Sequence, residues 1–388
     1  MWIERHIKTK ILRLSKSRPA LLLTGARQTG KSSLLQREFP ELPYITFDYL
    51  TQIEAFQDSP EHFLGRLDGP VILDEIQYVP EVFRELKILI DRQRERYGKW
   101  IMTGSQQFSL MKSVSESLAG RIAILHLETL SAAELRDKKI KNIEQFLWKG
   151  GYPELWSNRR LGFSDFFESY IRTYIERDLK TIIDVKNLSD FRRFIRMLAT
   201  RAGQLLNYKS LSSDVGVSDA TIRKWAHALE ISGLVYLLPP YYANIGKRLI
   251  KSPKVYFADH GLLCYLSGVD NKRRWHAHTH RGALWENFVM MEMVKRNGLS
   301  PGNDLFFYRD QNGVEIDFVA ERKGKLFFIE AKAGERADPK KLHFDKVAPL
   351  FKDRFPTENI LAQNIHEPGP VAGKGYVRIN PLYSAMPF

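Results

Sequence analysis

The sequence contains little cysteine: Cys264 is the only one among 388 residues. A single thiol excludes an internal disulfide framework and is typical of proteins in a reducing cytoplasm. Long apolar runs are also missing, and no stretch approaches the roughly 20 apolar residues of a membrane-spanning helix. The N-terminal stretch MWIERHIKTKILRLSKSRP mixes basic with aliphatic residues, and it has neither the apolar core nor the cleavage site of a signal peptide. We therefore expect a cytoplasmic protein that has no membrane partner and whose first residues form an amphipathic helix.

Internal repeats and low-complexity tracts are absent as well. The composition, with 44% hydrophobic and 27% charged residues, is that of an ordinary globular protein. The length allows two or three domains, each with its own core. Basic residues exceed acidic ones, giving a net charge of +14, and residues 151–260 have the largest excess for their length. This surplus suits contact with an acidic polymer such as DNA, although it does not specify one.

Apolar periodicity divides the chain into three regions. In the first, short apolar runs such as ALLLTG, PYITFD, GPVILDE and KWIMTG alternate with helical stretches, which indicates a parallel sheet in an α/β domain. The middle region has mainly helical patterns, and strand-like runs return after residue 300. We therefore predict domains at residues 1–150, 151–268 and 269–388.

The segment GARQTGKS matches the phosphate-binding pattern G-x-x-x-x-G-K-[ST] and stands between an apolar strand and a helical stretch. In such a loop, backbone N–H groups and a helix N-terminus hold the phosphates, Lys31 reaches the β- and γ-phosphates, and Ser32 ligates Mg²⁺. The sequence therefore predicts a site for ATP with Mg²⁺. Its binding residues are Gly25, Ala26, Arg27, Gln28, Thr29, Gly30, Lys31, Ser32 and Ser33.

Acidic residues follow a second apolar run, VILDE. We assign Asp74 to Mg²⁺, through a water, and Glu75 to orienting or deprotonating the attacking water. Gln106, after the run WIMTGS, is a candidate sensor of the γ-phosphate. Arg121 is a candidate for stabilising transition-state charge, in cis or from a neighbouring subunit. A loop amide and a surface arginine are equally good interpretations of these last two residues.

Residues 208–233 predict a helix-turn-helix, with Gly216 in the turn and Ser218 capping the second helix. The following run predicts two strands around a basic turn with Lys247, Arg248, Lys251 and Lys254, which would complete a winged helix. The candidate contacts to nucleic acid are Arg223, Lys224, Lys247 and Arg248. The alternative is that this module packs against the first domain or a protein partner.

Charged residues converge in the C-terminal region. A two-residue turn at Lys323 and Gly324 would place Asp317 opposite Glu330, and strand alternation would put Lys332 on the same face. A divalent metal would lie between Asp317 and Glu330, with Glu286 as a possible third ligand and Lys332 positioning a water. The candidate catalytic residues of this nuclease-like centre are Glu286, Asp317, Glu330 and Lys332. An exposed strand pair with cross-strand salt bridges is the alternative.

The motifs together resemble an AAA+-type ATPase family of bacteria and archaea that is related to the signal-transducing (STAND) P-loop ATPases. Members of this family carry a C-terminal domain of unknown function with a PD-(D/E)xK nuclease-like fold. The resemblance covers almost the whole chain. Besides the motifs above, it rests on Gly104-Ser105, Ala119-Gly120-Arg121, the segment GGYPE at residues 150–154 and the segment YIRTYIERD at residues 170–178. It implies ATP binding at Gly30, Lys31 and Ser32, hydrolysis through Glu75, and the nuclease-like centre at Glu286, Asp317, Glu330 and Lys332.

The resulting fold prediction is α/β: a P-loop AAA+-type ATPase domain, a winged-helix middle region and a C-terminal α/β restriction-endonuclease-like domain. The functional prediction is an ATP-binding and ATP-hydrolysing protein that is associated with nucleic acid, with a possible metal-dependent nuclease centre. The alternative is an ATP-gated oligomeric switch or protein-interaction ATPase whose C-terminal domain is catalytically silent. A homo-oligomer is possible in both cases.

Overall fold

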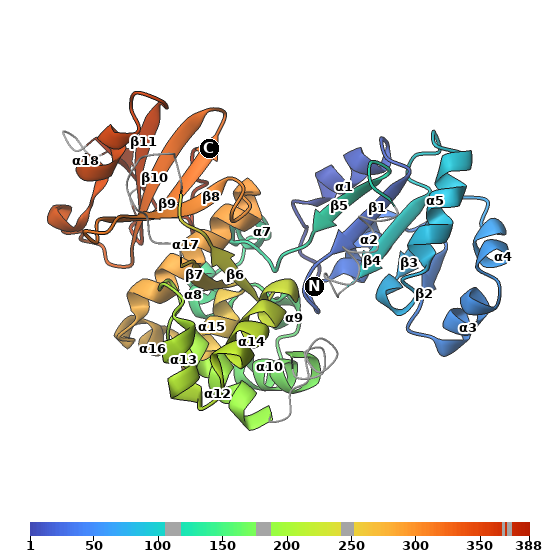
Figure 1. The fold of residues 1–388 in the computed structure, drawn as a ribbon, viewed down its shortest axis with the longest axis horizontal. Coiled ribbons are helices and arrows are strands. Elements are labelled where there is room, and N and C mark those ends of the chain that lie inside the picture. The colour runs from blue at the N-terminus through green and yellow to red at the C-terminus, as the bar shows by residue number, and fades with distance from the viewer. Residues whose placement is uncertain (105–117, 176–187, 242–251, 367–368, 371–374) are drawn as a thin grey trace. The chain divides into compact units, whose positions relative to one another are not determined.

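The computed structural model describes residues 1–104, 118–175, 188–241, 252–366, 369–370 and 375–388 (Figure 1). They form two compact units. One consists of Trp2–Glu128 with Ile231–Gly233, and the other of Met1, Thr129–Glu230 and Leu234–Phe388. In the described ranges, no helix combines the length and the apolar character needed to cross a membrane. The division into three domains at residues 150 and 268 stays a prediction.

The first unit is built on a five-stranded sheet of strand order β2-β3-β4-β1-β5, and every pairing in it is parallel. The predicted parallel α/β architecture is therefore confirmed for this unit. The strands are β1 (Ala20–Thr24), β2 (Tyr44–Thr46), β3 (Val71–Asp74), β4 (Trp100–Gly104) and β5 (Ile122–His126). The helices are α1 (Lys8–Ser15), α2 (Lys31–Glu38), α3 (Leu50–Asp58), α4 (Pro60–Gly65), α5 (Val82–Arg92) and a 3-10 turn at Ile76–Tyr78.

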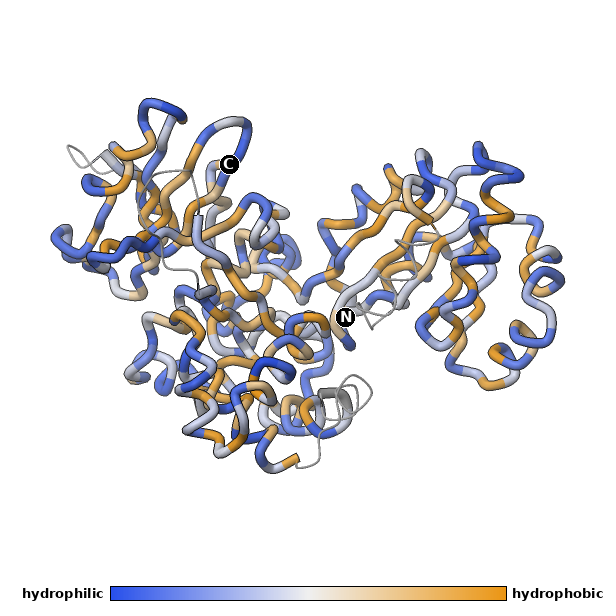
Figure 2. The backbone as a smooth tube through the Cα atoms, in the orientation of Figure 1, coloured by the Kyte–Doolittle hydropathy of each residue, from blue (hydrophilic) through white to orange (hydrophobic). Residues whose placement is uncertain are grey.

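Helices cover both faces of this sheet, because alternate strand residues point to opposite sides. Leu22 and Leu73 belong to an apolar core with residues of α3, α4 and α5. Leu21 and Ile72 belong to a second core with residues of α1 and α2. Figure 2 shows the hydrophobic strands of this sheet. Covered on both faces, the sheet leaves the carboxyl ends of its strands as the place for a ligand.

The second unit begins with short helices and a three-helix group. Its helices before β6 are α7 (Ala132–Asp137), α8 (Phe146–Lys149), α9 (Pro153–Ser157), α10 (Phe163–Tyr170), α12 (Leu188–Ala199), α13 (Tyr208–Val215) and α14 (Asp219–Ile231), with a 3-10 turn at Ile143–Gln145 and a π-helical turn at Ile171–Ile175. Trp225 of α14 packs edge-on against Phe191 of α12 at 5.4 Å and also contacts Phe194, which fixes α14 on α12. The apolar side of α14 is therefore part of the core.

The predicted helix-turn-helix order is confirmed in its elements. Gly216 ends α13 in a left-handed conformation, φ 82°, which glycine adopts at little cost. The Ser218 hydroxyl accepts the N–H of Thr221 at 3.1 Å, as an N-cap does. The strands β6 (Val235–Leu238) and β7 (Lys254–Phe257) pair antiparallel after it. The winged-helix fold as a whole stays a prediction, and Lys247, Arg248 and Lys251 lie outside the described residues.

The C-terminal part contains a mixed six-stranded sheet of order β12-β13-β11-β10-β9-β8. The neighbours β8, β9 and β10 are antiparallel, whereas β10 and β11 run parallel. The strands are β8 (Leu305–Arg309), β9 (Glu315–Arg322), β10 (Lys325–Lys332), β11 (Thr357–Gln363), β12 (Gly369–Pro370) and β13 (Val377–Ile379). The helices are α15 (His260–Leu266), α16 (Lys272–Ala277), α17 (Arg281–Asn297) and α18 (Phe344–Val347), with 3-10 turns at Pro339–Lys341 and Ala348–Leu350. The restriction-endonuclease-like fold stays a prediction for this sheet.

The glycine pair of the GGYPE segment has a packing role that the sequence did not reveal. Gly150 has φ 76°, and a Cβ atom there would lie 2.2 Å from Oδ1 of Asp259. A Cβ on Gly151 would lie 2.3 Å from the carbonyl oxygen of Leu130. This close approach lets the buried Asp259 carboxylate accept both the Thr129 hydroxyl, at 2.7 Å, and the Gly151 N–H, at 2.8 Å. The segment therefore holds Thr129 and Leu130, which belong to the second unit, in place within that unit.

Candidate functional site

The loop between β1 and α2 has the geometry of a phosphate-binding loop. Gly25 and Gly30 have φ of 144° and 90°, and a Cβ on Gly25 would lie 2.4 Å from the carbonyl oxygen of Leu127. Gly30 forms the N-cap of α2, so the N–H groups of the first helical turn point toward the loop. The Lys31 ammonium donates to the carbonyl oxygens of Gly25 and Ala26, at 3.0 and 2.9 Å. The predicted loop thus folds around its own lysine at the carboxyl edge of the sheet.

The N-terminal segment of the chain also holds the phosphate-binding loop in place, through Arg5. The buried guanidinium of Arg5 donates to the carbonyl oxygen of Thr29, at 2.9 Å, and to that of Glu128, at 2.6 Å. Thr29 itself donates to the carbonyl oxygen of Ala26 at 3.0 Å. Arg5 therefore joins the loop to Glu128, the last residue of this unit before Thr129. The sequence gives no signal for Arg5, because its role depends on three segments far apart in the chain.

The carboxylate of Asp74 is a focus of hydroxyl donors at the end of β3. Ser32 donates to Oδ1 at 2.9 Å, Thr103 also donates to Oδ1, and Tyr44 donates to Oδ2. Burial, followed by the neighbouring Asp74 carboxylate, raises the pKa of Tyr44, so the phenol stays protonated and acts as a donor. Ser32 and Asp74, each assigned to Mg²⁺ from the sequence, are thus hydrogen-bonded neighbours. These two oxygen-bearing side chains fit Mg²⁺, which takes oxygen ligands and keeps several waters.

Glu75 directly follows this strand in an unusual backbone conformation. Its φ and ψ are 55° and 43°, in the left-handed region that non-glycine residues seldom occupy. Its N–H donates to the Thr103 hydroxyl at 3.4 Å, and its carboxylate accepts the side-chain amide of Gln77. Observed strain of this kind points to a functional position. Glu75 stands at the same edge of the sheet as the loop, as its predicted role requires.

Arg121 lies at the opposite edge of this sheet from the loop. It precedes β5, whose first residue pairs with Ala20, the first residue of β1, while the loop follows the last residue of β1. Five strand residues separate the two ends by about 16 Å. The guanidinium forms two hydrogen bonds to the Asp91 carboxylate, at 2.7 and 2.9 Å, and holds the pKa of Asp91 below its usual value. A catalytic role for Arg121 is thereby restricted to the loop of a neighbouring copy. Gln106 lies outside the described residues.

The candidate contacts to nucleic acid on α14 differ in their surroundings. Arg223 donates to Asp219 at 3.0 Å, and its guanidinium lies 4.1 Å from the ring centre of Tyr208. Lys224 is exposed beside it. Both stay candidates. The prediction that Lys254 belongs to the basic turn is wrong, because Lys254 is the first residue of β7 and is only 2% exposed.

The register predicted for the hairpin of β9 and β10 is confirmed over its paired residues, which end just before the predicted pair of Asp317 and Glu330. Arg322 pairs with Lys325, and the ladder continues to Phe318 and Ile329. Beyond Phe318 and Ile329, the Asp317 side chain bonds to the backbone of β10, because its Oδ2 accepts the N–H of Ala331 at 2.8 Å.

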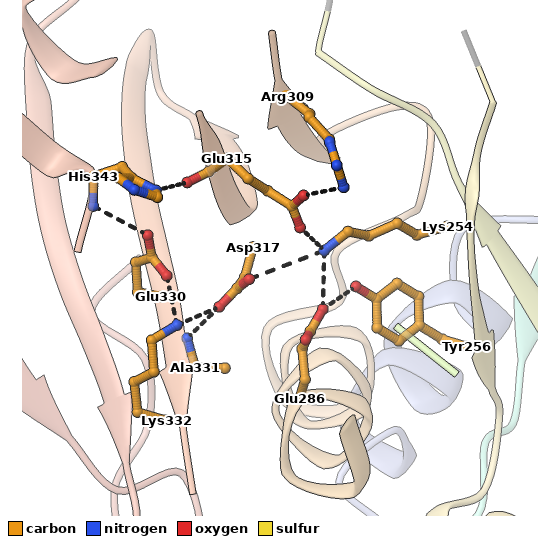
Figure 3. A network of polar contacts seen from close by, with 10 residues as sticks. All are labelled: Lys254, Tyr256, Glu286, Arg309, Glu315, Asp317, Glu330, Ala331, Lys332 and His343. Carbon is orange, nitrogen blue, oxygen red and sulfur yellow. Dashed lines mark hydrogen bonds and ion pairs between the residues drawn. The ribbon is translucent and has the colours of Figure 1, made fainter. Parts of the chain in front are cut away.

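The three predicted residues of this hairpin do converge (Figure 3). The Lys332 ammonium lies between the carboxylates of Glu330 and Asp317, at 2.7 and 3.3 Å. Glu286 of α17 is the fourth predicted member and approaches the same patch from the helix side.

A second lysine, unforeseen in this role, occupies the middle of the patch (Figure 3). The Lys254 ammonium lies 3.1 Å from Glu286, 2.5 Å from Glu315 and 3.9 Å from Asp317. We call these three carboxylates, with Glu330, Lys254 and Lys332, the acidic centre. Strand spacing alone did not reveal Lys254, because it reaches the centre from a different part of the chain.

Burial and charge shift the pKa values of the acidic centre in opposite directions. Burial, with a smaller contribution from Asp317, raises the pKa of Glu286 to about 7 and that of Glu330 to about 8, although a lysine opposes each shift. Burial would also raise the pKa of Asp317, but Lys332 and Lys254 outweigh it and the pKa is lowered. Burial acts to lower the pKa of Lys254, yet Glu286, Asp317 and Glu315 together raise it. The neighbouring carboxylates therefore favour the ammonium form of Lys254.

The acidic centre does not fit the predicted metal ion. Within the part of the chain that the structure describes, no three His, Cys, Asp or Glu side chains are grouped to hold a metal. The position between Glu286, Glu315 and Asp317 is taken by the Lys254 ammonium, and that between Asp317 and Glu330 by Lys332. The centre is instead an ion-pair network.

Three protein-family models together match most of the chain. The first is described as "AAA domain" and matches residues 17–136. The other two are domains of unknown function, DUF8612 at residues 140–273 and DUF4143 at residues 281–363. The first match covers the P-loop, Asp74 and Glu75, and the last covers all four predicted residues of the acidic centre.

Two mycobacterial proteins are similar over most of the chain. They are "Uncharacterized protein Rv2008c" of Mycobacterium tuberculosis and "Uncharacterized protein Mb2031c" of Mycobacterium bovis. Each is 33% identical over 335 residues, which cover 86% of this chain and 74% of the mycobacterial protein.

Among solved structures, the Walker-type ATPase PABY2304 of Pyrococcus abyssi has a TM-score of 0.42 at 17% identity, covering 68% of this chain and 96% of that chain. The RuvB Holliday junction branch migration motor of Thermotoga maritima has a TM-score of 0.32 at 16% identity, covering 61% of this chain and 90% of that chain. At these TM-scores neither structure adds to the functional argument.

Proposed function

We propose that the chain, which belongs to the same family as the two mycobacterial proteins and matches an AAA domain, binds ATP and hydrolyses it with Mg²⁺. The observation that carries the proposal is the arrangement at the end of β3. There the Asp74 carboxylate accepts a hydrogen bond from the Ser32 hydroxyl of the P-loop. Glu75 follows Asp74 in a strained backbone conformation at the same edge of the sheet. Asp74 and Ser32 would hold Mg²⁺, and Mg²⁺ would neutralise charge on the phosphates. Glu75 would orient or deprotonate the attacking water.

Lys31 provides the test of the nucleotide site. Replacing it with alanine removes the ammonium that faces the loop carbonyls of Gly25 and Ala26 and is expected to reach the phosphates. We expect Lys31→Ala to weaken ATP binding by about 10- to 100-fold, the range of a lost hydrogen bond to a charged group. Lys10→Ala, which removes an equal charge from the exposed side of α1, should leave the Kd for ATP unchanged. Equal ATP affinity in Lys31→Ala and wild type would refute the assignment.

A second candidate function is binding and cleavage of nucleic acid. The convergence of Asp317, Glu330 and Lys332 on one patch supports it, as does the basic character of the middle region. The Lys254 ammonium within the acidic centre weighs against a metal-dependent reaction and favours a silent C-terminal domain in an ATP-gated switch. A homo-oligomer is part of that switch proposal, since Arg121 can serve only the site of another copy.

Binding and cleavage assays with a labelled DNA duplex distinguish the nucleic-acid-processing candidate from the ATP-gated switch. If the chain processes nucleic acid, Lys224→Ala should weaken salt-dependent binding, and Asp317→Ala should abolish cleavage while ATP binding survives. Cleavage of neither DNA nor RNA by the wild-type protein would remove the nuclease candidate. Binding that is insensitive to Lys224→Ala would remove α14 as the contact.

A further inference from the structure

The position of Lys254 supports an inference that goes beyond ATP hydrolysis. We propose that the Lys254 ammonium is the resident cation of the acidic centre and that it excludes a divalent metal ion from Glu286, Glu315 and Asp317. The lysine would thereby join β7 to α17 and β9 as a fixed electrostatic contact. The proposal bears on the second candidate function but does not depend on nucleic-acid cleavage.

Burial makes this position of Lys254 dependent on its partners. The side chain is 2% exposed, and an ammonium removed from water is stable only where opposite charges and hydrogen bonds replace its hydration. The three carboxylates supply this replacement, with nitrogen–oxygen distances from 2.5 to 3.9 Å. A divalent cation bound by these oxygens would have to occupy the volume that the ammonium fills, since such metals lie at about 2.0–2.6 Å from their ligands.

The backbone of Lys254 is held on both sides, so the side chain is not a mobile arm. Lys254 pairs with Leu238 of β6, and it forms an isolated antiparallel bridge with Leu205. Withdrawing the ammonium from the centre would therefore require either a new rotamer in a buried space or the loss of this pairing. Because each of these changes would cost free energy, the observed position of the ammonium is favoured.

Each of the three carboxylates also accepts a hydrogen bond from a second donor, so its charge is compensated without a metal ion. The Tyr256 hydroxyl donates to Glu286 at 2.6 Å, and Arg309 donates to Glu315 at 2.8 Å. Asp317 accepts the Ala331 N–H. Hydrogen bonds and the Lys254 ammonium, with Arg309 at Glu315 and Lys332 at Asp317, thus satisfy these three carboxylates without a metal.

The test is direct titration with Mn²⁺, followed by electron paramagnetic resonance, without nucleotide. We expect wild type and Asp317→Asn to bind the same number of Mn²⁺ ions per chain, since any ion at Asp74 is common to both. Lys254→Met keeps the length of the side chain but removes its charge. It should gain about one Mn²⁺ per chain, and Lys254→Met with Asp317→Asn should lose that ion again.

Thermal unfolding provides a second readout. Lys254→Met should lower the Tm, and added Mn²⁺ should recover part of the loss. Lys332→Met is the matched control because this lysine is 30% exposed, and its Tm should fall less. One Mn²⁺ that wild type binds and Asp317→Asn does not would overturn the proposal, even if Lys254→Met fails to fold. Unchanged Mn²⁺ binding and unchanged Tm in Lys254→Met would overturn it as well. Because the readout is bound Mn²⁺, failure of this inference is distinct from failure of the nuclease candidate.

Discussion

Replacing Glu75 with glutamine should lower ATP turnover by about 10²- to 10⁴-fold while ATP still binds. Glutamine preserves the size of the side chain and its contact distance to Gln77, but it cannot accept a proton from the attacking water. The P-loop, Lys31 and Asp74 are untouched by this change, so the phosphates and Mg²⁺ keep their partners. Phosphate release under saturating ATP measures the loss, and equilibrium titration with ATP measures the retained affinity.

The control for this variant is Glu81→Gln, which makes the same substitution at an exposed residue next to the start of α5. Its turnover should equal that of the wild type. If Glu75→Gln turns over ATP at the wild-type rate, the catalytic base has to be sought elsewhere. If it loses ATP binding as well, Glu75 acts in nucleotide binding and the division of roles between Lys31 and Glu75 is wrong.

Replacing Gly151 with alanine should reduce the free energy of unfolding by about 3 kcal/mol or more, since overpacking against backbone has no flexible side chain to relieve it. The new Cβ would lie 2.3 Å from the carbonyl oxygen of Leu130, 2.8 Å from its nitrogen and 2.9 Å from the Thr129 hydroxyl oxygen. Moving that backbone would also disturb the hydrogen bonds that Asp259 accepts from Thr129 and Gly151. Chemical denaturation measured by circular dichroism gives the change.

Gly282→Ala is the matched control for this prediction. Gly282 lies in α17 of the same unit, and a Cβ there would meet nothing within 4 Å. Alanine is the better helix former by about 1 kcal/mol, so this variant should be as stable as wild type or slightly more stable. A Gly151→Ala protein with wild-type stability would show that the backbone at Thr129 and Leu130 can move, which contradicts the packing described above.

Features that depend on consecutive residues could be predicted from the sequence. The P-loop is one, because a strand, a glycine-rich loop and a helix follow each other directly. The register of β9 and β10 is another, since Lys323 and Gly324 both adopt positive φ, as a two-residue turn between antiparallel strands requires. Ser218 as a helix cap belongs to the same class.

Features that depend on distant segments could not be predicted in this way. The sequence around Lys254 predicts only a basic turn, because no nearby residue indicates that three carboxylates of α17 and β9 will surround the ammonium. The hydroxyl groups of Tyr44 and Thr103 reach Asp74 only because β2, β3 and β4 are neighbours in the sheet. Similarly, the pairing of Arg121 with Asp91 at the far edge of the sheet follows from the strand direction of β5, which the arginine's own surroundings do not reveal.

Turnover of ATP by the wild-type protein, compared with Lys31→Ala at the same concentration, tests the central claim most directly. We expect phosphate release by wild type that requires added Mg²⁺ and that Lys31→Ala abolishes, because Ser32 and Asp74 would hold the metal and Lys31 would bind the phosphates. Phosphate release that persists in Lys31→Ala, or that proceeds equally well without Mg²⁺, would contradict the assignment of this loop as the site of ATP hydrolysis.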